Sequence, residues 1–134
     1  MFPKHMHSTG LYYFELVKNF GGVPLLKEPL TINEANLARS TESEIWQQIE
    51  NDFSAAIDEL PKKSELNAAS IGRASKGAAM AYLAKTYLYQ NKYLEAQNYA
   101  SMVINTGEYN LNDSFENVWS INNPNGSGSI FEIQ

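Results

Sequence analysis

Two helix-forming segments lie between residues 75 and 107, and only the three residues at 90–92 separate them. A connection this short makes two consecutive helices run antiparallel and side by side. Ser75 is a suitable N-cap for the first segment, and Gly107 stands where the end of a helix favours a left-handed residue. The sequence therefore predicts a helix–turn–helix unit over about residues 75–107.

Small and aromatic residues of this unit recur at the offsets of a tetratricopeptide-type repeat. Ala84 and Ala96 are expected where the two helices cross most closely, and Tyr87 and Tyr93 are expected to wedge beside that crossing. The predicted structural repeat positions are Leu83, Ala84, Tyr87, Tyr93, Ala96 and Ala100.

Two further helices are expected earlier in the chain. Residues 11–20 carry apolar side chains, ending with Phe20, at the spacing of one buried helix face, and two glycines follow. Residues 41–60 begin with a capping box formed by Thr41 and Glu44, and Pro61 ends the helix. Trp46 falls on the apolar stripe of this segment, so we expect it in the core.

The rest of the chain shows little helical periodicity. Residues 22–40 contain two prolines, and residues 108–129 are rich in Asn, Ser and Gly. Residues 129–134 alternate apolar and polar side chains, which predicts a short strand. The fold class is therefore all-α, with tetratricopeptide-like antiparallel helix pairs, long irregular loops and a short C-terminal strand.

Composition excludes several classes of function. The net charge of −5 argues against nucleic acid, because binding phosphates requires a basic surface. The chain has no cysteine, hence no thiolate metal site or cysteine nucleophile. It also contains no apolar run of the roughly 18–20 residues that span a bilayer. The N-terminus shows no signal peptide and no Cys for lipidation.

No pattern of catalytic or metal-binding residues emerges. His5 and His7 supply two ligands where a metal site usually needs three or four, and the loop around Asp113 lacks the calcium-loop pattern. The acidic residues of the second helix, Asp52, Asp58 and Glu59, are expected on its solvated side. The sequence therefore predicts no enzyme, no metal and no cofactor. Trp119, in an Asn-rich loop, is the one aromatic residue placed to stack on a sugar ring.

The order of these segments resembles the SusD/RagB family of outer-membrane nutrient-binding lipoproteins. The matching pieces, in family order, are YYFELV at 12–17, FGGVPL at 20–25, EIW at 44–46, DF at 52–53, LP at 60–61, GRASKGAA at 72–79, YLY at 87–89, YLEA at 93–96, GEYNL at 107–111 and IFEIQ at 130–134. Family members are several times longer, so the resemblance implies that residues 1–134 are a single partial domain, an internal helical portion of a larger protein.

The resemblance also implies a function. The full-length protein is expected at the outer membrane, on the cell surface, where it captures an oligosaccharide and passes it to a TonB-dependent transporter. No glycan-binding residue can be carried over to a matched position, and the isolated chain is expected to bind oligosaccharides weakly or not at all. The alternative is a generic tetratricopeptide-like scaffold for protein–protein interaction. A tandem period of about 34 residues would favour that scaffold, and the irregular segments break any such period.

Overall fold

The computed structural model describes residues 3–26, 36–67, 69–111 and 114–132, with the backbone alone for residues 3–8. Within these ranges the chain is helical and contains no strand. The elements are α1 (Pro3–Phe20), α2 (Glu42–Glu59), the short 3-10 helix η2 (Lys63–Glu65), α3 (Lys76–Tyr89), α4 (Tyr93–Asn105) and α5 (Phe115–Val118). The all-α prediction is confirmed.

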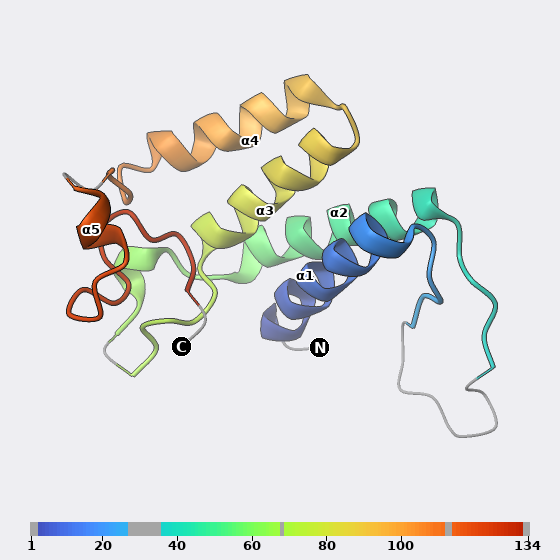
Figure 1. Ribbon diagram of the computed structural model, residues 1–134, viewed down its shortest axis with the longest axis horizontal. Coiled ribbons are helices and arrows are strands. Elements are labelled where there is room, and N and C mark those ends of the chain that lie inside the picture. Colours follow the sequence, from blue (N-terminus) through green and yellow to red (C-terminus); the bar gives the residue numbers. More distant parts are fainter. Residues whose placement is uncertain (1–2, 27–35, 68, 112–113, 133–134) are drawn as a thin grey trace.

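Each of the four long helices packs against its neighbour in the sequence: α1 against α2, α2 against α3, and α3 against α4. The chain reverses direction at each connection, so that successive helices form antiparallel pairs (Figure 1). Between α3 and α4, Asn91 has a φ of 61°. Asparagine tolerates this left-handed conformation better than most residues, which allows the tight reversal that the short connection predicts.

The core is built from aromatic and aliphatic side chains of α1, α2 and α3. Phe14 of α1 and Phe53 of α2 are both fully buried. The Phe14 ring meets the Trp46 ring edge-on with 5.8 Å between centroids, and the Phe53 ring stacks on Tyr82 at 5.6 Å. Such aromatic contacts add to the free energy gained from burying apolar surface. Trp46 is buried, as its place on the apolar stripe predicted.

Helix boundaries follow the local signals in the sequence. Thr41 caps α2: its hydroxyl accepts a hydrogen bond from the Glu44 N–H at 3.3 Å, and the Glu44 carboxylate accepts one from the Thr41 N–H at 2.8 Å. Ser75 caps α3 by accepting from the Ala78 N–H at 3.3 Å. Gly107, after α4, has a φ of 67°. These boundaries were predicted from capping chemistry, and the structure confirms them.

Two of the expected elements differ from the structure. Helix α1 begins at Pro3, well before the predicted start at residue 11, and Phe20 at its other end is 65% exposed, not buried. The strand predicted for residues 129–134 does not form over 129–132, and residues 133–134 lie outside the described part of the chain. The Ser129 N–H bonds back to the Gly126 carbonyl at 3.0 Å, so a local turn replaces the strand.

The predicted repeat positions occupy different environments. Leu83 and Ala96 are buried, Ala84 is half-buried, and Ala100 is exposed. The Tyr87 ring stacks on Tyr99 with 5.7 Å between centroids. Tyr93 is 63% exposed, and its hydroxyl donates to the Asn91 side chain at 2.8 Å. Tyr93 therefore does not wedge between α3 and α4, because its position at the first residue of α4 directs it to solvent.

We expect Ala96→Leu to lower the free energy of unfolding by about 1–3 kcal/mol, because a larger side chain must overpack the buried side of α4. Ala100→Leu is the matched control on the same helix. Since Ala100 is exposed, its replacement should change stability by less than about 0.5 kcal/mol. Urea denaturation followed by far-UV circular dichroism compares the two, and equal midpoints would contradict a close contact at Ala96.

Asp52 is buried, although the sequence placed it with Asp58 and Glu59 on the solvated side of α2. Its Oδ1 accepts a hydrogen bond from Gln48 Nε2 at 2.8 Å, and its Oδ2 has no hydrogen-bond partner within the described ranges. Burial raises the pKa of the Asp52 carboxyl above its ordinary value, and the bond from Gln48 opposes this only in part. The ionised form therefore destabilises the fold.

Asp52→Asn should stabilise the protein at pH 7, by on the order of 1 kcal/mol, because it removes an uncompensated buried charge. The folded-state pKa of Asp52 is raised, so the native state holds the proton more tightly and stability rises as the pH falls towards the ordinary value of 3.8. The variant should lose that part of the pH dependence. Thermal unfolding between pH 4 and 8 measures this pH dependence of stability. The control is Asp58→Asn, because Asp58 is exposed and its replacement should leave the pH dependence due to Asp52 unchanged.

Candidate functional site

The C-terminal segment, described over residues 107–111 and 114–132, folds back over the linker between α2 and α3 and over the beginning of α3 (Figure 1). Within the segment, the Asn110 N–H donates to the Ser127 carbonyl at 3.0 Å. Tyr109 anchors the segment to the helices: its hydroxyl lies 3.2 Å from the Ser75 hydroxyl, and its ring covers Gly77.

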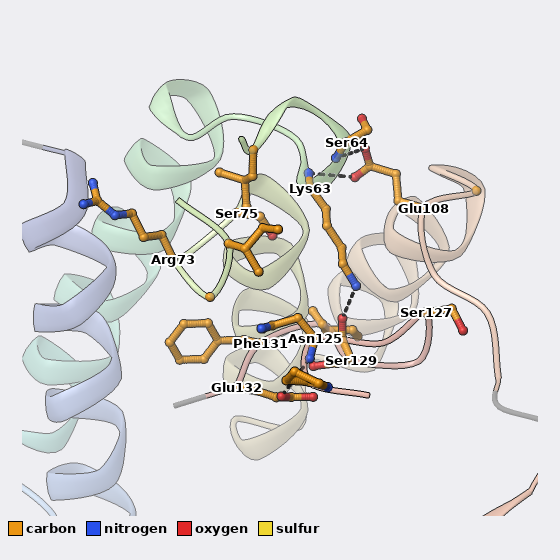
Figure 2. Close-up of a pocket in the computed structure, with 16 residues that line it drawn as sticks. Lys63, Ser64, Arg73, Ser75, Glu108, Asn125, Ser127, Ser129, Phe131 and Glu132 are labelled. Carbon is orange, nitrogen blue, oxygen red and sulfur yellow. Dashed lines mark hydrogen bonds between the residues drawn. The ribbon is translucent and has the colours of Figure 1, made fainter. Parts of the chain in front are cut away.

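Lys63 joins the linker to the C-terminal segment. Its ammonium donates to the Ser129 carbonyl oxygen at 2.8 Å (Figure 2). It also donates to the Gly126 carbonyl oxygen at 2.8 Å and lies 5.2 Å from the centre of the Tyr109 ring. Partial burial lowers the pKa of Lys63, while the carboxylates of Glu132 and Glu108 act in the opposite direction. The ammonium is thus directed at backbone carbonyls, which fixes the turn that contains Gly126.

Glu108 makes a second connection between the same two parts of the chain. Its carboxylate accepts hydrogen bonds from the Ser64 hydroxyl at 2.6 Å and from the backbone N–H groups of Ser64 and Lys63 at 3.2 Å (Figure 2). Slight burial acts to raise the pKa of Glu108, but the bonds from Ser64 and Lys63 outweigh it and hold that pKa below its ordinary value. Glu108 therefore stays ionised and bonded at neutral pH.

We expect Lys63→Met to loosen residues 124–132, because two charge-assisted bonds to carbonyl oxygens are lost while the aliphatic stem is kept. The free energy of unfolding should fall by about 1.5 kcal/mol. Hydrogen–deuterium exchange should become faster in residues 124–132 and stay unchanged in α2. The neighbouring exposed Lys62→Met is the matched control, and equal exchange in both variants would show that Lys63 does not hold this segment.

A cavity of about 590 Å³ lies between the linker and the C-terminal segment, with Lys63 and Glu108 in its wall. Its lining combines apolar side chains, including Ile71 and Phe131, with polar ones such as Asn125. The Glu132 carboxylate, which also lines this cavity, accepts a hydrogen bond from the Asn125 N–H at 3.0 Å (Figure 2). This volume is in the range of small-molecule sites, which are mostly apolar with a few placed polar groups.

An adjoining hollow of about 630 Å³ lies beside α5 and contains Trp119. The Trp119 side chain is 73% exposed, while Asn117, Asn123 and Glu132 supply polar groups around it. Ile130 and Phe131 border both hollows. An exposed indole ring beside amide and carboxylate groups is chemically suited to the apolar face and the hydroxyls of a sugar ring.

Trp119 and Asn123 line the same hollow, whereas Asn122, the other polar neighbour that the sequence offered, does not line it. Phe131 and Glu132 were missed because they were assigned to a strand. Within the described ranges, no three acidic or histidine side chains come together as a metal site would require. His5 and His7 lie where only the backbone is described, and residues 112–113 lie outside the described part of the chain. None of the helices described is both long and apolar enough to cross a bilayer.

The helical part of the chain matches a known family. The sequence model of the family described as starch-binding and associating with the outer membrane, a SusD-like family, matches residues 6–88, more than half of the 134 residues. The chain belongs to the SusD-like family. A SusD-like protein of Bacteroides ovatus is 29% identical over 135 residues, which cover 91% of this chain and 24% of that relative.

Solved structures of SusD-like proteins share the same fold. A SusD-like carbohydrate-binding protein from Bacteroides fragilis has a TM-score of 0.94 and 27% identity, over 98% of this chain and 26% of its own. A laminarin-binding SusD-like protein has a TM-score of 0.87 and 35% identity, over 96% of this chain and 29% of its own. The chain thus spans about a quarter of the length of these SusD-like relatives.

Proposed function

We propose that residues 1–134 are the helical portion of a carbohydrate-binding SusD-like protein of the outer membrane, exposed at the cell surface. The whole protein captures an oligosaccharide and passes it to a TonB-dependent transporter. The observation that supports this most is the likeness of fold over nearly the whole chain to proteins described as carbohydrate-binding and laminarin-binding. Starch and laminarin are both uncharged glucose polymers, so a neutral glucan is the substrate class that the relatives favour.

The helices contribute to this function mainly as a support. The aromatic residues Phe14, Trp46 and Phe53 are buried in contacts between helices and are therefore not available to a ligand. Tyr12 and Tyr93 are exposed on the helical surface, at 69% and 63%. Exposed aromatic side chains of this kind favour binding to another protein. We infer that the helical surface is where the transporter binds.

The alternative is a generic tetratricopeptide-like scaffold that binds unrelated proteins. The two antiparallel pairs, α1–α2 and α3–α4, are compatible with it. A solenoid stacks repeats of similar length with short connections, whereas here residues 107–132 fold back over the linker and make their own hydrogen bonds to it. This irregular segment, together with the family match, favours the glycan-binding protein.

Two measurements on the purified chain distinguish the two functions. The immobilised chain should retain a TonB-dependent transporter from detergent-solubilised outer membranes, identified by mass spectrometry, and Tyr12→Ser with Tyr93→Ser should weaken that retention. Calorimetric titration with laminari- and malto-oligosaccharides should give at most a weak response, because the rings of Phe14, Trp46 and Phe53 are buried in the core. Retention of other proteins without any transporter would contradict the proposal and support the scaffold.

A further inference from the structure

Helix α5 holds the Trp119 indole ring in an exposed position. Trp119 is the C-cap residue of α5, and its backbone N–H donates to the Glu116 carbonyl at 3.3 Å. The Phe115 ring meets the Trp119 ring edge-on at 6.3 Å and 61°, which limits how far the indole can turn. With 73% of its surface exposed, the indole is nevertheless available at the edge of the hollow beside α5.

The polar groups around Trp119 are held in place by bonds to the backbone. Asn123 Nδ2 lies 3.5 Å from the Asn117 carbonyl, and the Asn123 N–H donates to the Ser120 carbonyl at 3.0 Å. The Glu132 carboxylate is positioned by the Asn125 N–H. An amide presents both donors and acceptors, and a carboxylate presents acceptors, so the pair suits the adjacent hydroxyls of a sugar. Gly126 leaves the Asn123 side chain room, since a Cβ there would lie 2.5 Å from Asn123 Nδ2.

The charges around the hollow select against an anionic ligand. Among the residues that line it, Glu132 is the single ionisable side chain. The hydrogen bond from the Asn125 N–H is the main cause that lowers the pKa of Glu132, so this carboxylate is ionised at neutral pH. The nearby Lys63 ammonium donates to two carbonyl oxygens of the same turn, facing the other cavity. The Lys63 ammonium offsets part of the Glu132 charge but does not line this hollow, so a carboxylated or sulfated glycan would meet the Glu132 carboxylate without a cation in the lining.

We propose that the hollow beside α5 is a binding subsite for a neutral glycan, in which Trp119 stacks on one sugar ring while Asn123 and Glu132 bind its hydroxyls. This inference rests on the proposed function, and it specifies where on the chain a neutral glucan makes contact. One aromatic platform with two polar side chains gives weak binding, with half-saturation on the order of 1 mM. The weak calorimetric response expected of the isolated chain then arises from glycan bound at Trp119.

Tryptophan fluorescence tests the position of the ligand directly, because the chain has two tryptophans in opposite environments. Trp46 is buried and its Nε1 donates to Glu42 at 3.1 Å, whereas Trp119 is exposed, so acrylamide quenches Trp119 selectively. Laminarihexaose and maltohexaose should protect the quenchable emission with half-saturation on the order of 1 mM. A hexamer of galacturonic acid should protect at least about tenfold less well, because it meets the charge of Glu132.

Variants separate this subsite from any other glycan contact. Trp119→Ala should weaken calorimetric binding of the glucan hexamers by roughly tenfold or more, and Trp119→Phe should restore part of it. Phe20→Ala, which removes a similarly exposed ring at the end of α1, should leave the affinity unchanged. Because Trp119 is exposed, its removal should not change the far-UV circular dichroism, which verifies folding.

Three other outcomes would contradict a glycan-binding subsite at Trp119. Unchanged glucan affinity in Trp119→Ala would place the glycan elsewhere on the chain and leave the proposed function standing. Absence of any glucan response up to about 20 mM, well above the expected half-saturation, would overturn the subsite, while transporter retention would still decide the proposed function. A change of oligomeric state in Trp119→Ala without loss of protection from quenching would instead identify the α5 face as a protein contact.

Discussion

Replacing Phe14 by alanine is expected to lower the free energy of unfolding by about 3–5 kcal/mol, the range for a fully buried phenylalanine. The Phe14 side chain has no exposed surface and meets rings from two other helices: Trp46 of α2 at 5.8 Å, and Tyr89 of α3 at 5.2 Å. The Lys85 ammonium also lies 5.2 Å from the centre of its ring. Truncation therefore leaves a cavity at the junction of α1, α2 and α3.

This loss is large compared with the total stability of a domain of this size, which is about 5–15 kcal/mol. We expect the variant to be partly unfolded at 37 °C and to have a strongly reduced midpoint in urea. Tyr12→Ala is a close control, because Tyr12 lies two residues earlier on the same helix and is 69% exposed; it should cost less than about 0.5 kcal/mol. Similar midpoints for the two variants would show that α1 does not pack as described.

The helices could be predicted because the signals that start and end them are local. Thr41 and Glu44 are three residues apart, and the side chain of each accepts a hydrogen bond from the backbone N–H of the other. The capping box therefore depends on no residue elsewhere in the chain. Ser75 and Gly107 likewise act locally, within one turn of the helix end that each of them marks. The start of α1 was missed because residues before Leu11 lack an apolar stripe, which is the main signal that sequence periodicity offers.

The candidate site could not be predicted, because its contacts join residues far apart in the sequence. Lys63 donates to carbonyls 63 and 66 residues later, and no local pattern identifies those acceptors. Phe131 and Glu132 looked like parts of a strand because the alternation of side chains does not reveal whether a partner strand exists. Trp119 was singled out for a different reason: it lies in an Asn-rich loop, where the side chains of Asn122 and Asn123 could donate to the hydroxyls of a sugar.

The burial of Asp52 shows the same limit inside a regular helix. Periodicity assigned it to the solvated side of α2, yet it directly precedes the buried Phe53 at the border of the apolar stripe and is itself buried. Whether a residue at such a border position is exposed or buried depends on the packing angle between helices, which the local sequence does not determine. Tyr93 shows the converse, an aromatic residue predicted to pack that is exposed because α4 begins there.

The contact between Gly77 and Tyr109 leads to the second large effect that we expect. Gly77 is buried in the first turn of α3, and a Cβ at this position would lie 2.2 Å from the Tyr109 hydroxyl oxygen and 2.7 Å from the ring atom Cε2. Real Cβ atoms do not come this close to another heavy atom, so any side chain at residue 77 must displace the Tyr109 ring. Glycine costs about 1 kcal/mol relative to alanine within a helix, and here it is required by the close approach of that ring.

Gly77→Val should therefore destabilise the protein by about 3 kcal/mol, at the upper end for overpacking, because the β-branched side chain gives the ring no room to adjust. The displaced Tyr109 would also lose its contact with the Ser75 hydroxyl and its position beside the Lys63 ammonium. The C-terminal segment should detach, which hydrogen–deuterium exchange in residues 107–132 would detect as faster exchange. In a double-mutant cycle with Tyr109→Ala, the cost of Gly77→Val should fall to about 1 kcal/mol or less, since neighbouring residues couple strongly. Additive losses in the double variant would mean that Tyr109 does not cover Gly77 and that the segment is held to α3 by other contacts.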